Sequence, residues 1–82
     1  MQKRLLIIRN PESPLLDYLD LRRENQEIFL IQNALYSGKL REGDVKMLDE
    51  DARARKIEAG GKSADYDALL DAVFTNDLVI CI

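Results

Sequence analysis

Short apolar runs recur along the chain and are separated by segments with helical spacing. The run KRLLIIR, residues 3–9, is aliphatic and is followed by Asn10-Pro11. A residue that precedes proline is disfavoured in the helical region, so this run predicts a buried strand followed by a turn. EIFLIQ predicts a second buried strand, DVKMLDED a more polar third one nearer a sheet edge, and LVICI the last. A fourth strand of two or three residues is expected at 62–64.

Two helices are expected in the first half of the chain. Ser13 can cap a helix that has Pro14 at its first position and reaches about Arg23. Serine accepts hydrogen bonds from free N–H groups at a helix start, and proline has no N–H to leave unpaired. Asn33 is placed to cap a short helix that runs through Tyr36. Capping is therefore the simplest interpretation of Asn33.

Two further helices are expected in the second half. Carboxylates at 49–51 favour the start of a helix over residues 52–61, which Gly60-Gly61 would stop. The last helix has the clearest pattern, because its apolar positions repeat at i, i+3, i+4, i+7 and i+8. These positions are Tyr66, Leu69, Leu70, Val73 and Phe74.

Alternation of apolar strands with helices predicts one small α/β domain over residues 1–82, with a mainly parallel sheet and helices on both faces. A domain this short buries a modest share of its surface, which favours a dimer or a higher oligomer. In parallel sheets, ligands gather beyond the carboxyl ends of the strands. The candidate residues at that edge are Asn10, Gln32, Asn33, Asp49 and Cys81.

Composition removes several classes of function. With 12 basic and 15 acidic residues the formal charge is -3, which argues against binding a nucleic acid by bulk electrostatics, so any contact with tRNA is expected to be indirect. The chain has no histidine and one cysteine, and this excludes the usual zinc sites and histidine-based triads. The sequence has no glycine-rich phosphate loop, so no cofactor is expected. The apolar segments are too short for a membrane span or a signal peptide, so a cytoplasmic protein is expected.

Three segments in this order resemble a known family: LIQNALYSG after the second strand, VKMLDEDARARKI and DYDALLDAVF. LIQNAL, residues 30–35, is similar to the LLQDG(V/I) stretch of the DsrH/TusB family of sulfur-relay subunits, in the DsrE/DsrF/DsrH-like group, and residues 48–56 are similar to its L-x-x-D-x-x-A-R-G segment. Ala34 replaces a usual glycine, and Lys56 stands where a glycine commonly follows the arginine matched by Arg55. The resemblance covers nearly the whole chain.

The resemblance implies a five-stranded sheet in the order 4-3-2-1-5. It also implies a complex with DsrE/TusD-like and DsrF/TusC-like paralogues, which passes persulfide sulfur toward 2-thiouridine in tRNA or, in sulfur oxidisers, toward sulfite reductase. The cysteine that bears the persulfide belongs chiefly to the DsrE/TusD-like partner. Some DsrH proteins have a cysteine on the first helix, but the equivalent region around Tyr18 and Leu19 has none.

Each candidate residue has a plain structural alternative. Cys81 lies among apolar neighbours, so it is expected to be packed in the core, with a role as a sulfur carrier as the alternative. Asn33 is interpreted either as a helix cap or as part of a pocket shared between subunits. Gln32 is interpreted either as a solvent-exposed residue or as part of an interface. Tyr36 is interpreted either as a core residue or as an interface anchor. Together with Leu35 it is expected to form an apolar patch that binds a second copy of the chain or a paralogue.

A cationic cluster is the remaining candidate. Arg53, Arg55 and Lys56 are interpreted as a solvated helix face or as a docking surface for an acidic partner or RNA. The leading hypothesis is a subunit without catalytic residues of its own, in a sulfur-relay complex. The alternatives are a homo-oligomer that carries sulfur on Cys81, and a small binding module unrelated to sulfur.

Overall fold

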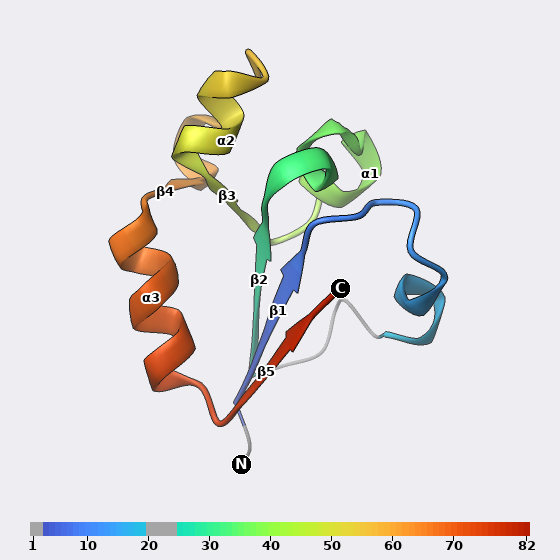
Figure 1. Cartoon of the computed structure of the whole chain (residues 1–82), viewed down its shortest axis with the longest axis vertical. Coiled ribbons are helices and arrows are strands. Elements are labelled where there is room, and N and C mark those ends of the chain that lie inside the picture. The colour runs from blue at the N-terminus through green and yellow to red at the C-terminus, as the bar shows by residue number, and fades with distance from the viewer. Residues whose placement is uncertain (1–2, 20–24) are drawn as a thin grey trace.

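The computed structural model describes residues 3–19 and 25–82 and has a five-stranded parallel sheet in the order β4-β3-β2-β1-β5 (Figure 1). The predicted α/β class and the strand order expected from the resemblance are both confirmed. The outer strand β4 has only two residues, as expected. The strands are β1 (Arg4–Ile8), β2 (Gln26–Leu30), β3 (Lys46–Leu48), β4 (Ser63–Ala64) and β5 (Leu78–Cys81).

The strand order decides which face of the sheet each helix covers. Steps from β1 to β2, β3 and β4 all run in one direction, whereas the step from β4 to β5 returns across the sheet. Crossovers between parallel strands are right-handed, so connections made in opposite directions lie on opposite faces. The last helix, α3 (Tyr66–Thr75), is therefore alone on its face among the described helices.

Two core clusters mark the two faces. The larger cluster contains Leu6, Ile8 and Leu30 from the strands and buried residues of the second and third connections, such as Leu35 and Ala52, and partly buried residues of the first connection pack against it. The smaller cluster contains the alternate strand residues Leu5, Phe29 and Leu48 and, from α3, Leu69 and Ala72. The period of two along each strand sends neighbouring side chains to opposite faces, which is why both faces of the central strands are apolar.

The first connection contains a 3-10 helix, η1 (Pro14–Tyr18). Ser13 caps it as predicted, because its Oγ accepts from the Leu15 amide at 3.3 Å, and Pro14 is the first helical residue. The helix ends at Tyr18 rather than near Arg23, since the chain at Leu19 is already extended. Positions 20–23 of the predicted helix lie outside the described residues.

The second connection holds two short helices where one was expected. The 3-10 helix η2 (Gln32–Tyr36) is followed by α1 (Gly38–Arg41), which the sequence pattern had not revealed. Ser37 caps α1, because its Oγ accepts from the Leu40 amide at 3.2 Å. The prediction that Asn33 caps η2 is wrong. Ile31 holds the cap position and Asn33 lies within the helix.

The third connection begins with α2 (Asp49–Ala54), which carries three carboxylates in its first turn. The helix ends at Ala54 and not at Gly60-Gly61, because the next residues form a Schellman motif. The Ile57 amide donates to the Ala52 carbonyl at 2.9 Å, and the Lys56 amide donates to the Arg53 carbonyl at 3.2 Å. Lys56 has a φ of 55°. Gly60–Lys62 then forms the 3-10 helix η3 before β4.

Candidate functional site at the carboxyl edge of the sheet

Residues that follow β2 and residues that follow β3 meet at the carboxyl edge of the sheet. Figure 1 shows α1 and α2 at the end toward which the strands point. Because β2 and β3 are neighbours, η2 and α2 are placed side by side. Five residues make up what we term the carboxyl-edge cluster: Gln32, Asn33, Tyr36, Asp51 and Arg55.

Asp51 is the centre of this cluster. Its Oδ2 accepts from the Gln32 amide at 2.9 Å, and its Oδ1 lies 3.6 Å from Nη1 of Arg55. The side chains of Asp51 and Arg55 are 24% and 20% exposed, so water screens this ion pair less than a pair on the open surface. Gln32 has a φ of 51°, in the left-handed region, and its bond to Asp51 helps to hold this unfavourable conformation.

Arg55 connects α2 to η2 in two further ways. Its Nη2 donates to Oδ1 of Asn33 at 3.4 Å, and its guanidinium lies 5.9 Å from the centre of the Tyr36 ring. Tyr36 is itself 60% exposed. The cluster thus presents an aromatic ring supported by a cation whose charge Asp51 balances. Such a surface can bind a partner, but it holds neither a thiol nor a pair of free carboxylates for catalysis.

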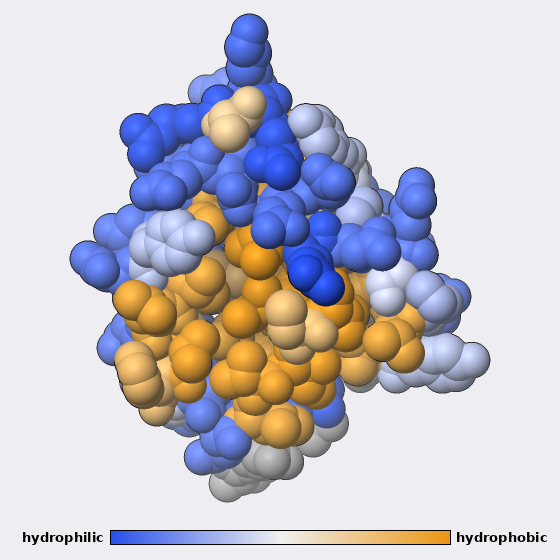
Figure 2. Space-filling model, in the orientation of Figure 1, coloured by the Kyte–Doolittle hydropathy of each residue, from blue (hydrophilic) through white to orange (hydrophobic). Residues whose placement is uncertain are grey.

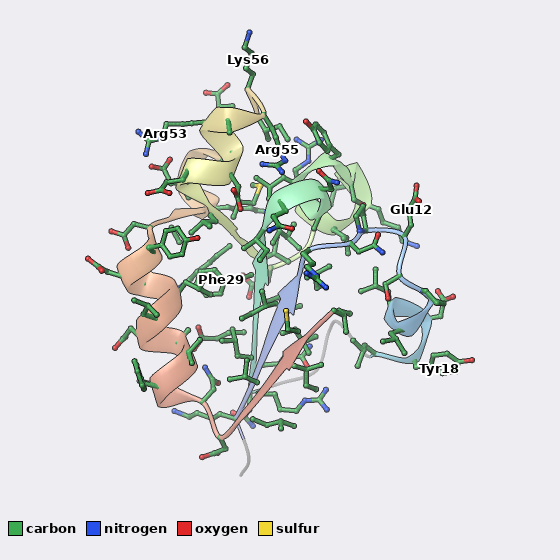
Figure 3. All side chains as sticks on the ribbon, viewed as in Figure 1. Glu12, Tyr18, Phe29, Arg53, Arg55 and Lys56 are labelled. Atoms are coloured by element: carbon green, nitrogen blue, oxygen red, sulfur yellow. The ribbon has the colours of Figure 1, made fainter. Side chains whose placement is uncertain are left out.

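The cationic cluster expected from the sequence is divided by the helix. Figure 3 shows Arg53 and Arg55 on opposite sides of α2, with Lys56 at its far end. Arg53 forms an ion pair with Asp49 at 3.0 Å and its side chain is 72% exposed. Asp49 also accepts from Ser63 Oγ at 3.1 Å, which fastens α2 to β4. Only Arg55 of the three cations belongs to the carboxyl-edge cluster.

Two expectations about apolar residues at this edge need correction. Leu35 is completely buried, so it cannot form a surface patch with Tyr36. It faces the core because η2 folds back over the sheet and its buried side consists of Ala34 and Leu35. Tyr36, the next residue, is exposed and is not a core residue.

The expectation that Cys81 is buried is also wrong, since its side chain is exposed. Cys81 pairs in register with Ile7, whose side chain packs on the face that carries α3. The strand β5 forms the edge of the sheet, and none of its residues is fully buried. Apolar neighbours in sequence therefore did not indicate burial here.

Asn10 has a local structural role. Its Oδ1 accepts from the Glu12 amide at 3.0 Å, a turn made by the side chain itself. Asn10 therefore stabilises the turn after β1 and does not join the carboxyl-edge cluster.

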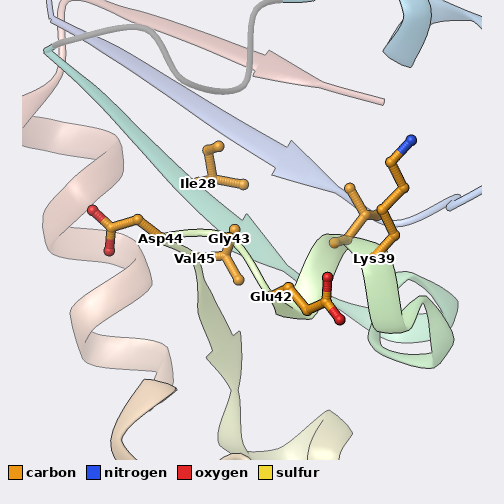
Figure 4. Close-up of a pocket in the computed structure, with 7 residues that line it drawn as sticks. Ile28, Lys39, Glu42, Gly43, Asp44 and Val45 are labelled. Atoms are coloured by element: carbon orange, nitrogen blue, oxygen red, sulfur yellow. The ribbon is translucent and has the colours of Figure 1, made fainter.

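A hollow of about 660 Å³ lies apart from this cluster, beside α1 and the loop that leads to β3 (Figure 4). Its floor is formed by Ile28, Leu40 and Val45, all of which belong to the larger core cluster. Charged groups of both signs, Lys39, Glu42 and Asp44, lie around it. This hollow is an apolar depression with a mixed rim, and the sequence pattern gave no sign of it.

The structure and the comparisons bear on the remaining sequence predictions as follows. Within residues 3–19 and 25–82, no helix is long and apolar enough to cross a bilayer. The same residues contain no group of three or more carboxylate or thiol side chains placed to hold a metal ion. Comparison of the chain with protein-family models, curated proteins and solved structures finds no match.

Asp51 is the residue of the cluster that the sequence reasoning did not select. Its position predicts a carboxylate at a helix start, and it is the aspartate of the L-x-x-D-x-x-A-R-G match. Its spacing of four residues from Arg55 on the same helix was the available signal, since such pairs face each other. The contact with Gln32 required knowledge of the strand order.

Proposed function

We propose that this chain is a non-catalytic subunit of a cytoplasmic sulfur-relay complex of the DsrH/TusB kind. One observation carries the proposal. Residues 30–35 and 48–56, two of the segments that resemble the family, lie far apart in sequence yet supply four of the five residues of the carboxyl-edge cluster, and Tyr36 directly follows the first segment. Gln32, Asp51 and Arg55 match the family motifs, and Asn33 stands where the motif has an aspartate. The matched residues thus gather at one site, as a shared interface requires.

The conformation of Lys56 supports the same proposal. In the family pattern a glycine commonly stands at this position, and here the backbone has a φ of 55°. Glycine is favoured in that region because it has no Cβ. The resemblance and the backbone geometry therefore agree on where α2 must end.

In this proposal the carboxyl-edge cluster is a docking surface for a DsrE/TusD-like or DsrF/TusC-like paralogue. Tyr36 is the anchor, because an exposed, rigid aromatic ring offers a large contact area at small entropic cost. Arg55 and Asp51 fix the orientation of η2, and Gln32 and Asn33 supply polar groups at the rim. The partner provides the persulfide cysteine, and tRNA binds other parts of the assembly.

The test is purification of this chain from its native cells, with mass spectrometry to find whether a DsrE/TusD-like or a DsrF/TusC-like paralogue purifies with it. Tyr36→Ala should weaken assembly and reduce transfer of labelled sulfur. Tyr18→Ala is the matched control, because Tyr18 is 86% exposed on η1 and takes no part in the cluster. Recovery of neither paralogue, or equal loss with both variants, would contradict the proposal.

A specific observation favours one alternative function. Cys81 is exposed, so it is accessible to a sulfur donor. Its thiolate would attack the outer sulfur of a partner's persulfide, form Cys81–S–SH after protonation, and release the partner's cysteine thiolate without net oxidation. The chain would then be a sulfur carrier.

Cys81→Ala separates the two functions. The scaffold function predicts that the reconstituted complex still transfers sulfur, whereas the carrier function predicts loss of transfer with intact assembly. Mass spectrometry of the chain during turnover would find a gain of one sulfur atom on Cys81 only in the second case. A binding module unrelated to sulfur would show neither assembly with the paralogues nor a persulfide.

A further inference from the structure

One broad face of the molecule is only partly covered. Because α3 is the only described helix on its side of the sheet, the strand residues beyond its reach have no helix over them. Figure 2 shows the result as a continuous apolar surface over α3 and the neighbouring strands β1, β2 and β5. We term this surface the α3–β5 face. Its residues are Ile7, Tyr66, Leu70, Phe74, Val79 and Cys81.

The exposure of this face is large for so small a protein. Tyr66, Leu70, Phe74 and Val79 are 52%, 51%, 83% and 38% exposed. With ~200 Å² for a whole aromatic side chain and less for an aliphatic one, these four expose roughly 400 Å². The largest apolar patch of a whole monomer is typically about 300–600 Å² and often functional. The α3–β5 face therefore has the character of an interface.

The face combines a ridge with an open surface beside it. Residues Tyr66, Leu70 and Phe74 are spaced by four, so they form a single line along α3 next to the buried line that includes Leu69. The open strand surface beside it is formed by the exposed Val79 of β5 and the partly buried Ile7 of β1. Two copies of such a surface can fit together, because the ridge of each copy can pack into the open area of the other.

From this geometry we propose that the α3–β5 face binds a second copy of this chain, related by a two-fold axis. Each α3 then covers the open strands of the other copy, in the place where a second helix on this face would lie. The lengths agree, because the line from Tyr66 to Phe74 spans about 12 Å at ~1.5 Å per residue. The three steps from Leu78 to Cys81 of β5 span about 10 Å at ~3.3 Å per residue.

The size of the molecule gives an independent reason. Its extents are 37 × 28 × 18 Å, so it is a thin plate whose broad side is viewed in Figures 1 and 2. Stable dimers bury about 800 Å² per partner. The exposed apolar side chains supply about half of that area, and the polar groups around them supply a rim, which is the usual composition of an interface.

The charge of this face predicts how salt affects the dimer. Asp67 and Asp71 are exposed on α3 beside the apolar line, and Asp65 caps the same helix. Each copy has a formal charge of -3, so two copies repel each other as a whole, and added salt should strengthen the dimer by screening this repulsion. Binding to a basic protein surface would instead weaken as salt is added. The direction of the salt effect distinguishes these two occupants.

The test uses the full chain in sedimentation velocity over a range of concentrations. Leu70→Glu is compared with Leu15→Glu, because Leu15 is 54% exposed on η1 and lies on the other face. The wild type and Leu15→Glu should form dimers, whereas Leu70→Glu should raise the dissociation constant on the order of 100-fold. A two-fold axis brings two substituted residues into each dimer, and each of them should raise the dissociation constant about tenfold. Circular dichroism must show that both variants keep the wild-type fold, and Phe74→Ser replaces Leu70→Glu if that variant unfolds.

Alkylation of Cys81 provides a second readout on the unmodified chain. The thiol lies on the α3–β5 face, so its reaction with iodoacetamide should slow as the protein concentration passes the dissociation constant. A monomeric wild type at millimolar concentration overturns the proposal, as does a dimer that Leu70→Glu and Phe74→Ser leave intact. The proposal does not depend on the proposed function, since the carboxyl-edge cluster and its Tyr36→Ala test involve a different surface.

Discussion

The carboxyl-edge cluster and the α3–β5 face are two exposed surfaces of one small domain that differ in how their side chains are held. In the cluster, Asp51 and Arg55 connect α2 to η2 through hydrogen bonds and an ion pair, and leave one aromatic ring exposed. On the α3–β5 face the exposed side chains of Leu70 and Phe74 are apolar and make no directional bond. The side chains of the first surface are held in place by directional bonds, whereas the second surface consists mainly of exposed apolar side chains.

This difference determines how well each surface can distinguish one binding partner from another. Charged hydrogen bonds fix orientation and reject wrong partners, because a misplaced partner leaves polar groups unpaired. Apolar area attracts without direction and is well suited to joining identical copies. The two proposals therefore place partner choice at the carboxyl-edge cluster and self-association at the α3–β5 face.

The largest effect is expected beneath the carboxyl-edge cluster. Leu35→Ala should lower the free energy of unfolding by about 3 kcal/mol, because the side chain is fully buried and its loss leaves a cavity. Tyr36→Ala, at the adjacent exposed position, should change it by less than about 1 kcal/mol. Urea denaturation of both variants measures the difference. Equal losses would mean that Tyr36 is also a core residue and that the cluster is not a docking surface.

A smaller effect is expected for the ion pair within the cluster. Asp51→Ala should destabilise the fold by about 2 kcal/mol, because the Gln32 amide and the half-buried Arg55 both lose a charged partner. Glu50→Ala is the matched control, since Glu50 is an exposed carboxylate in the same helical turn. Its removal should cost only the interaction with the helix dipole, about 0.5 kcal/mol. If thermal unfolding shows a larger loss of stability for Glu50→Ala than for Asp51→Ala, the structure of the cluster is contradicted.

Stabilisation is expected at the end of α2. Lys56→Gly should raise the free energy of unfolding by about 1 kcal/mol, because a residue with a Cβ is strained at a φ of 55° and glycine is not. Lys56→Ala keeps the Cβ and removes only the charge, so it should have little effect. If the alanine variant gains as much as the glycine variant, charge rather than backbone strain explains the change.

The smallest effect is expected at Cys81. Since the thiol is exposed, Cys81→Ala should change the free energy of unfolding by less than about 0.5 kcal/mol. In dilute solution, where the chain is monomeric, the native protein should react with iodoacetamide at a rate close to that of the urea-unfolded protein. A native rate lower by a hundredfold would show that β5 is covered even in the monomer.

Local sequence located most of the elements and several residues of the site. The apolar runs gave the strands, and the repeat from Tyr66 to Phe74 gave α3. Gln32 and Asn33 were selected because they follow a strand, Tyr36 as a possible interface anchor, and Arg55 as part of a cationic helix face. Their mutual contacts through Asp51 could not be predicted, since these depend on which strands are neighbours.

Burial was the property that sequence alone predicted least well. Leu35 and Cys81 were each expected in the wrong environment, and three of the five residues in the apolar repeat of α3 are exposed. An apolar repeat shows that a segment prefers to bury one side, because the pattern follows from the periodicity of the helix or strand. It does not show whether anything is available to cover that side.

The sequence by itself thus determined the α/β class, most of the element positions and the polar character of the carboxyl edge. Only the tertiary structure decided which residues meet there and which face of the sheet stays open. The physical reason is the handedness of the crossovers, which sends three connections to one face and a single helix to the other. That division leaves Phe74 and Val79 uncovered in this chain, although nothing in their local sequence distinguishes them from core residues.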